Sequence, residues 1–153
     1  MTASAPVRLG TGHVGLNVTN LDRAVDFYRR ALGFEQLSAN TEGEHRYAFL
    51  GFDGVLQLTL WQQSGTPFST QTAGLHHLAF QVDSVEQVRG IESALRELGV
   101  KFSYDGVVAH GEGAPSGGIF FYDPDGIRLE VYAPNGGETA PAPSGAEPTC
   151  GFF

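Results

Sequence analysis

The stretch LHHLAFQVD at residues 75–83 decides the fold, because most of it repeats an earlier stretch, HVGLNV at residues 13–18. When the two copies are aligned on His13 and His77, each position carries a residue of the same kind. Large apolar residues alternate with small or polar ones, which is the period-2 pattern of a strand with one face on a core. The two histidines fall on the faces that lack the large apolar side chains. Internal repetition of this kind bears on the whole architecture.

The repeat continues from each strand into a helix and a glycine stop. Asn20 stands as an N-cap before an apolar stripe with i, i+3, i+4 spacing, and that stripe ends at Gly33. Ser84 and Gln87 have the spacing of a capping box before a second stripe, which ends at Gly99. Both halves therefore predict a strand followed by an amphipathic helix with the same boundary signals.

Three further strands are expected after each helix. They span residues 34–39, 46–50 and 55–61 in the first half, and 102–107, 118–122 and 127–132 in the second. Asp53-Gly54 and Asp125-Gly126 mark tight turns before the last strand of each half. The prediction is an α+β fold of two tandem βαβββ modules, about 12–62 and about 75–134, within one domain at 12–134. Chance similarity between two ordinary strand–helix pairs is the alternative.

Four segments lie outside the predicted regular structure. Residues 1–11 are expected to be flexible, residues 64–74 link the modules, and residues 105–118 form a Gly-rich loop of the kind that often carries function. The Pro-, Gly- and Ala-rich tail at 135–153 contains Cys150, the only cysteine, so no disulfide can form within the chain. We expect Phe152 and Phe153 to pack on the domain or on a partner subunit.

Composition excludes several classes of function. With 153 residues the chain can form one domain with a sizeable core. Its net charge of -8, with only 9 Lys and Arg residues, argues against nucleic-acid and anionic-membrane binding. We expect no signal peptide, because no charged segment followed by an apolar run opens the chain, and no apolar run reaches the roughly 20 residues of a membrane span. We expect a cytoplasmic protein.

Strand alternation selects the residues that could carry chemistry. His13, His77 and Glu130 fall on the faces opposite the helices, and so does Gln57. If the two modules curl their sheets around one cavity, these side chains converge on it. Two imidazoles and a carboxylate are costly on an inner wall unless they are paired or bind a metal, and this set suits non-haem Fe(II) or another divalent ion. Hydrogen-bonded core histidines with a rim glutamate are the alternative.

These residues belong to longer motifs that resemble the vicinal oxygen chelate superfamily. The motifs are GHVGLNV at 12–18, DFYRRALGF at 26–34, HHLAF at 76–80 and FYDPDGIRLE at 121–130. This superfamily includes glyoxalase I, methylmalonyl-CoA epimerase, fosfomycin-resistance and bleomycin-binding proteins, and extradiol dioxygenases. The resemblance implies an open cupped barrel with a divalent metal at positions matching His13, His77 and Glu130.

The same resemblance leaves the subclass open at Gln57. Glyoxalases commonly have a carboxylate ligand at this position, epimerases can have glutamine, and the dioxygenases use only His, His and Glu. Bidentate chelation of two neighbouring substrate oxygens is the shared chemistry, in which the metal acts as a Lewis acid.

Because the three-ligand set is complete without Gln57, our first prediction is an Fe(II) dioxygenase acting on a small catechol-like or vicinally oxygenated substrate. Mn, Ni, Zn or Co are the other candidate ions. His110 and Tyr122 are the candidate acid–base groups, although His110 could equally be a solvated loop histidine.

Two other functions stay open. A glyoxalase- or epimerase-type isomerase or lyase needs a base, for which Glu112 is a candidate. A drug- or natural-product-binding resistance protein is the second alternative, although such binders lack the metal triad. Fosfomycin-type activity is disfavoured because Lys101 is the only lysine, and Arg46 and Arg128 are isolated.

Aromatic residues are expected to line part of the substrate cavity and to fill part of the core. The candidates for substrate contact are Phe49, Trp61 and Phe120, together with Gln57, and Tyr47 and Tyr104 lie near them. We also expect a homodimer. If the two halves of one site came from different chains, the site would lie at the subunit interface with the same ligands.

Overall fold

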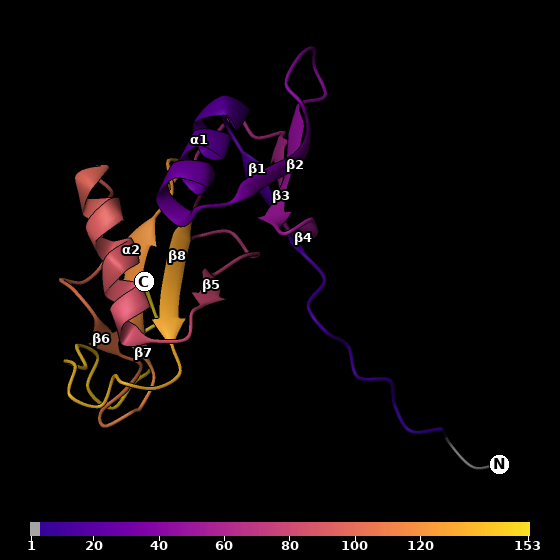
Figure 1. The fold of residues 1–153 in the computed structure, drawn as a ribbon. Helices are drawn as coiled ribbons and strands as arrows, with labels where there is room; N and C mark the ends of the chain where they lie inside the picture. The colour runs from indigo at the N-terminus through magenta and orange to yellow at the C-terminus, as the bar shows by residue number, and fades with distance from the viewer. Residues whose placement is uncertain (1–3) are drawn as a thin grey trace.

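The computed structural model describes residues 4–153, so the first three residues of the expected flexible lead-in lie outside it. The chain forms two four-stranded mixed sheets, each with one helix (Figure 1). The first module contains β1 (Val14–Val18), α1 (Leu21–Leu32), β2 (Glu35–Asn40), β3 (Tyr47–Phe52) and β4 (Val55–Gln62). The second contains β5 (Leu78–Gln81), α2 (Val85–Glu97), β6 (Val108–Ala109), β7 (Gly117–Tyr122) and β8 (Arg128–Ala133). The predicted α+β fold of two βαβββ modules is confirmed.

The two sheets have the same topology. Their strand orders are β1-β4-β3-β2 and β5-β8-β7-β6. In each sheet the first strand runs parallel to the last, and the remaining pairs are antiparallel. Parallel neighbours need a long crossover connection, which the helix and the two intervening strands supply in both modules. The sequence repeat is therefore a repeat of topology.

Both helices begin and end at the residues that the sequence marks. The Asn20 side chain accepts a hydrogen bond from the Arg23 backbone at 3.0 Å, and Gly33 adopts a left-handed φ of 75°. Ser84 and Gln87 form the complete capping box at the start of α2. These local interactions satisfy amide groups that a helix end otherwise leaves without partners.

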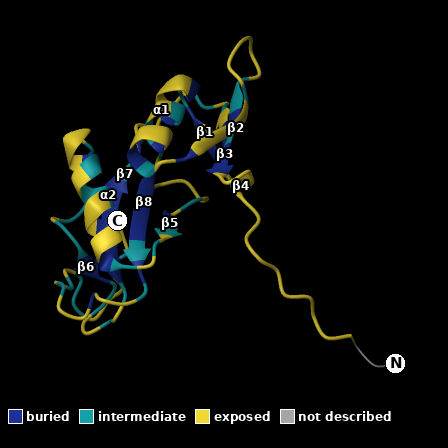
Figure 2. Cartoon of the chain, in the orientation of Figure 1, coloured by how far each residue is buried: buried dark blue, intermediate teal, exposed yellow. Residues whose placement is uncertain are grey.

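The core lies between each helix and its own sheet. In the first module, Leu16, Leu58 and Leu60 are fully or almost fully buried beneath α1, and in the second module Ile119 and Leu129 are buried beneath α2. Figure 2 shows this division, with exposed residues along the outer helix faces and buried residues along β7 and β8. Burying one such side chain contributes about 1.5–3 kcal/mol, so the cores favour these helix–sheet pairs.

The strand expected over residues 102–107 is wrong. Phe102 makes only an isolated bridge with Phe121, and β6 is a two-residue strand inside the segment expected to be a loop. Gly106 adopts a φ of 76°, which turns the chain away from an extended path.

The two predicted turns differ from each other. Asp53 and Gly54 both adopt positive φ angles, 51° and 77°, as a tight two-residue hairpin requires. Between β7 and β8 the connection is longer, and the Asp123 carbonyl accepts a hydrogen bond from Gly126 at 3.0 Å.

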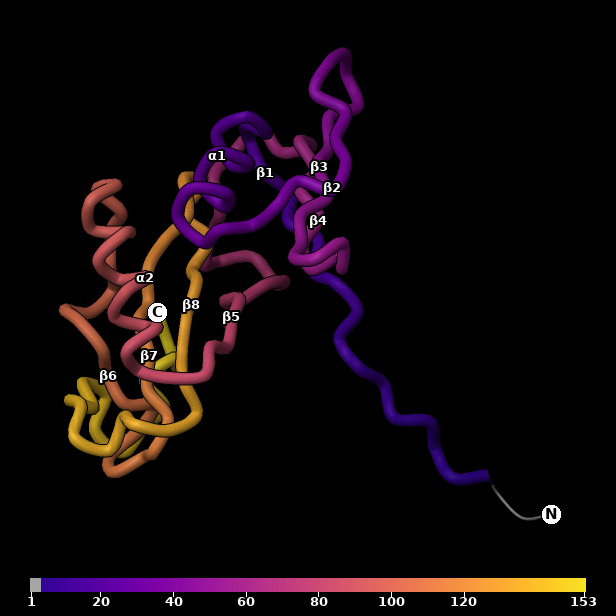
Figure 3. The backbone as a smooth tube through the Cα atoms, viewed as in Figure 1, coloured from indigo at the N-terminus to yellow at the C-terminus, as the bar shows by residue number. Residues whose placement is uncertain are grey.

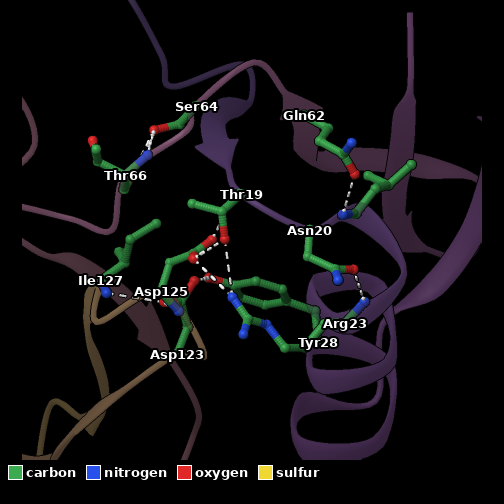
Figure 4. A network of polar contacts seen from close by, with 11 residues as sticks. Thr19, Asn20, Arg23, Tyr28, Gln62, Ser64, Thr66, Asp123, Asp125 and Ile127 are labelled. Carbon is green, nitrogen blue, oxygen red and sulfur yellow. Dashed lines mark hydrogen bonds and ion pairs between the residues drawn. The ribbon is translucent and has the colours of Figure 1, made fainter. Parts of the chain in front are cut away.

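A polar network joins the modules (Figure 4). The Tyr28 hydroxyl of α1 donates to Asp123 Oδ2 at 2.9 Å, and the Thr19 amide donates to Asp125 Oδ2 at 2.9 Å. Arg23 adds an ion pair with Asp125 at 3.0 Å. Burial raises the pKa of Asp123, and it also raises the pKa of Tyr28, with the nearby Asp123 charge as the next cause. The β7–β8 turn is thereby fastened to the first module.

The C-terminal segment returns along the second module (Figure 3). The Ala109 amide donates to the Pro141 carbonyl at 2.8 Å, and the Thr149 amide donates to the His110 carbonyl at 2.9 Å. Within residues 4–153, no helix combines the length and apolar character needed to cross a membrane.

Candidate metal site and its surroundings

The face of the second sheet that is turned away from α2 carries the candidate site. Along β8, Leu129 and Val131 belong to the core, and alternation turns Arg128 and Glu130 to the opposite face. Phe120 of β7 lies opposite Glu130 in the sheet, and Ala79 of β5 lies beside it on the other side. Strand register therefore brings side chains from three strands together around Glu130.

Glu130 contacts two imidazoles. It is only 2% exposed, and its Oε2 lies 3.5 Å from His77 Nε2. Its other oxygen, Oε1, makes a short hydrogen bond with His110 Nε2. The remaining ring nitrogen of His110 lies 2.6 Å from the Ser116 hydroxyl, which orients the ring. The structure thus joins a predicted ligand pair to the predicted acid–base histidine.

His77 has the electrostatic character of a metal ligand. Burial lowers its pKa, although the neighbouring Glu130 charge acts in the opposite direction. The neutral form, which can donate a nitrogen lone pair to a metal, is therefore favoured at neutral pH. Its Nδ1 lies 2.8 Å from Nδ1 of His76. Sequence analysis assigned no role to His76, whose only signal was its adjacency to His77.

His13 lies elsewhere. It precedes β1 by one residue, is exposed, and makes no hydrogen bond or ion pair with the rest of residues 4–153. Over those same residues, no group of three or more His, Cys, Asp or Glu side chains could hold a metal ion. A nitrogen from His77 and an oxygen from Glu130 are suitable donors for a divalent transition metal. One chain therefore brings together two of the three predicted ligands, and His13 is not part of this cluster.

The predicted substrate-contact residues are divided between the sheets. Phe49 and Trp61 belong to the first sheet, where they form a cluster with Tyr47 whose ring centroids are 5.3–5.8 Å apart. Phe120 belongs to the second sheet and is fully buried. Gln57 is exposed on β4 and lines a cleft of about 400 Å³ between the modules. Both sheets would be needed to surround one substrate with all four side chains.

Tyr122 and Glu112 lie at the edges of the second module's site. Tyr122 pairs across the sheet with Arg128, and its hydroxyl accepts a hydrogen bond from Ser103 at 2.8 Å. Glu112 is exposed in the Gly-rich loop. Neither is among the residues that contact Glu130.

The C-terminal tail covers part of this face. The sequence predicted only that its terminal phenylalanines would pack on the domain or on a partner subunit. Arg128 Nη1 donates to the carbonyls of Cys150 and Gly151 at 3.0 and 3.3 Å. The Phe153 ring packs on His76 with 4.3 Å between centroids. Phe152 is 93% exposed, so only Phe153 packs on the domain within one chain, and packing of Phe152 on a partner subunit stays a prediction.

Comparison with known proteins identifies the family. The family model described as "Glyoxalase/Bleomycin resistance protein/Dioxygenase superfamily" matches residues 10–131. The chain therefore belongs to this superfamily, the vicinal oxygen chelate proteins that the motifs resembled.

Its characterised relatives catalyse different reactions. The chain is 31% identical to a trivalent organoarsenical cleaving enzyme of Bacillus sp. (strain MD1), covering 78% of this chain and 70% of that protein. It is 29% identical to a lactoylglutathione lyase of Escherichia coli O157:H7, over 78% of this chain and 88% of that one. A catechol-2,3-dioxygenase of Bacillus subtilis (strain 168) is 26% identical over 80% of this chain, but the chain spans only 40% of its length.

Solved structures share the fold. A glyoxylase/bleomycin resistance protein/dioxygenase domain from Frankia sp. EAN1pec superposes with a TM-score of 0.72 at 26% identity, covering 83% of this chain and 98% of that one. The fosfomycin resistance protein FosX from Listeria monocytogenes, complexed with Mn(II) and sulfate, superposes with a TM-score of 0.62 at 22% identity, covering 83% and 93%. Members of the superfamily thus bind divalent metal ions, and distant relatives of this chain are enzymes.

Proposed function

We propose that the protein is a divalent-metal-dependent enzyme whose site is completed between two copies of the chain. His77 and Glu130 of one copy hold the ion together with His13 of the other. The observation that carries this proposal is the contact between half-buried His77 and buried Glu130, together with an exposed His13, the repeat counterpart of His77, that lies apart from them. A two-fold dimer would contain two equivalent sites, each completed by His13 of the other chain.

The exposed face of the first sheet supports a shared site. Val55 is 58% exposed and Trp61 36% exposed on this face, and Gln57 is exposed between them. On the second sheet, Ala79 and Gln81 of β5 are also exposed. Exposed aromatic and apolar side chains on a sheet face favour contact with another surface. Pairing the first sheet of one copy with the second sheet of the other would cover both.

Oxidative cleavage of a small catechol-like or vicinally oxygenated substrate by Fe(II) and O₂ is the reaction we favour. A bound ion would chelate two neighbouring substrate oxygens and lower the pKa of a hydroxyl among them. His110, whose Nε2–H would donate to the Glu130 carboxylate, would accept the released proton at Nδ1, the nitrogen that faces the Ser116 hydroxyl. Gln57 carries an amide and cannot serve as a carboxylate base. The aromatic side chains of both sheets would bind the substrate ring.

A glyoxalase-type isomerase or lyase is the second candidate. It is favoured by the match to lactoylglutathione lyase, which extends over 88% of that enzyme, whereas the match to the catechol dioxygenase extends over 40%. The exposed position of Glu112 weakens it, because a base in solvent is not held against a substrate.

Elemental analysis of protein purified without oxygen, followed by activity assays, tests the proposal. We expect iron to be bound and the Fe(II) form to consume oxygen with catechols. The panel should include a hemithioacetal of an α-ketoaldehyde and a trivalent aromatic arsenical, since relatives act on lactoylglutathione and organoarsenicals. Nickel, zinc or cobalt with isomerase activity would select the second candidate. Protein that binds no metal but captures a ligand tightly would refute both.

A further inference from the structure

Arg128 is a buried cation in the candidate site. It is 3% exposed, its guanidinium lies 5.1 Å from the ring centroid of Phe120, and it precedes Glu130 by two residues on the same strand face. A guanidinium keeps its charge in proteins. None of the ion pairs found among residues 4–153 involves it. A buried guanidinium without an ion-pair partner costs free energy that pairing with an anion would offset.

The hydrogen bonds of Arg128 leave room for such an anion. Nη1 donates to two backbone carbonyls, those of Cys150 and Gly151, whereas Nε is buried and has no hydrogen-bond partner. Neutral carbonyls are weaker partners for a guanidinium than a carboxylate, which accepts two parallel charge-assisted hydrogen bonds. The two tail carbonyls thus occupy the place where an anion could bind Arg128, but they carry no negative charge.

The tail lies beside the predicted metal ligands. Phe153 packs on His76, the neighbour of His77, and its ring centroid is 5.7 Å from the Arg128 guanidinium. A group that replaced the Cys150 and Gly151 carbonyls would therefore lie next to the His77–Glu130 pair. This is where the remainder of a substrate would extend from its two chelating oxygens.

The end of the tail can leave while its base stays attached. Thr149 is 1% exposed, its hydroxyl donates to the Ala109 carbonyl at 2.5 Å, and its own carbonyl accepts from the Tyr104 hydroxyl at 2.9 Å. Beyond Thr149, the contacts are the two Arg128 hydrogen bonds and the Phe153 ring, which packs on His76 and Phe68 and is itself 57% exposed. Thr149 is therefore firmly anchored, whereas the residues after it are held by few contacts.

We propose that Arg128 binds a carboxylate of the substrate, and that the Cys150 and Gly151 carbonyls occupy Arg128 until the substrate displaces them. For the favoured reaction, this names a carboxylated catechol as the substrate class. The assignment of the substrate rests on the proposed function, but carboxylate binding at Arg128 does not require the metal.

Cys150 provides a reporter, since it is the only cysteine of the chain and lies in the displaced segment. The experiment measures the rate at which a chromogenic disulfide labels Cys150 in the full-length, metal-free protein. Protocatechuate is the carboxylated probe, and catechol is its neutral counterpart. We expect protocatechuate to accelerate labelling about tenfold and catechol to leave it unchanged, because a charge-assisted pair with Arg128 replaces the two carbonyl contacts.

Three substitutions sharpen the test. Arg128→Gln should label rapidly without any probe and should not respond to protocatechuate, whereas Arg89→Gln, which removes the same charge from the exposed face of α2, should behave as wild type. Phe153→Ala should lower the protocatechuate concentration needed for half-maximal acceleration, because the tail competes less well. If Arg128→Gln fails to fold, the wild-type probe pair and Phe153→Ala still decide the question.

Turnover by the Fe(II) form separates this proposal from the proposed function. Arg128→Gln should raise the ratio of the KM for protocatechuate to the KM for catechol about tenfold. Accelerated labelling in a protein that binds no metal would support the anion site and refute the metal enzyme. Turnover without a preference for the carboxylated substrate, together with labelling that ignores protocatechuate, would overturn the role of Arg128 alone.

Discussion

Glu130 shows how single residues define this site. A carboxyl group that is 2% exposed needs hydrogen-bond or ionic partners, and here both oxygens contact imidazoles. The two imidazoles have different surroundings, since His110 is held by Ser116 and His77 contacts His76. The proposal gives them different tasks, proton transfer for His110 and metal binding for His77.

Substituting Glu130 and His110 separately tests this division between metal binding and proton transfer. Glu130→Gln should reduce the bound metal at least about tenfold, because the amide cannot act as an anionic ligand. His110→Gln should retain the metal, since the amide can still bond Glu130 and Ser116, but should lower kcat about 10²–10⁴-fold through loss of proton transfer. Metal content and single-turnover rates of the Fe(II)-loaded proteins measure both effects.

Glu44→Gln, on the exposed β2–β3 connection, is the matched control for the loss of charge. Loss of metal from His110→Gln would contradict the division and make His110 a ligand.

At the scale of elements, the β7–β8 turn and α1 depend on each other. Asp123 Oδ1 accepts hydrogen bonds from the amides of Asp125 and Ile127, both at 2.9 Å, and Oδ2 accepts from Tyr28. The same carboxylate thus shapes the turn and fastens it to the first module. Its burial nevertheless raises its pKa from the ordinary value of 3.8.

This raised pKa predicts how stability varies with pH. A carboxyl whose pKa is higher in the folded state stabilises the fold fully below its unfolded pKa, and that contribution is lost as pH rises through the folded value. Asp123→Asn removes the titration, can keep an oxygen that accepts from the two amides, and can donate from its Nδ2 to the Tyr28 hydroxyl oxygen. The free energy of unfolding of wild type minus that of Asp123→Asn should therefore decrease from about pH 4 to neutral pH, as urea titrations would measure.

Tyr28→Phe provides a second check on this network. It removes a donor to the buried carboxylate and should cost about 1–3 kcal/mol at neutral pH. A pH-independent difference between wild type and Asp123→Asn would show that this carboxyl does not titrate differently on folding.

At the scale of the molecule, the question is how two half-sites meet. The repeat equivalents His13 and His77 each precede the first strand of a different sheet, and in one chain only His77 reaches Glu130. The network at Asp123 and the contact between Phe34 and Phe80, with centroids 5.5 Å apart, hold the two modules side by side. Under the proposed function, a site that uses both inner faces would therefore need a second chain.

Mixing two inactive variants tests this arrangement. In a shared-site dimer, a His13→Ala chain paired with a Glu130→Gln chain contains one site with both substitutions and one intact site. Random pairing should thus restore about a quarter of the wild-type metal content and activity after the variants are unfolded and refolded together. Each variant refolded alone is the control. No recovery in the mixture would place the complete site within a single chain.

The sequence by itself determined the local structure and the faces of the strands. The repeat predicted both modules, Asn20 and Ser84 predicted the helix starts, and alternation placed Arg128 and Glu130 on the face opposite the core. These features follow from interactions between residues near in the chain, which a sequence displays directly. The strand predicted at 102–107 failed because Gly106 turns the chain, although its neighbours have suitable apolar residues.

Only the tertiary structure decided which faces meet. It set the two modules side by side, left His13 away from His77, put His110 against Glu130, and laid the tail over Arg128. These contacts join residues that are distant in the chain and depend on how whole layers pack. A periodic pattern shows which side of a strand is polar, but it does not show what that side will touch.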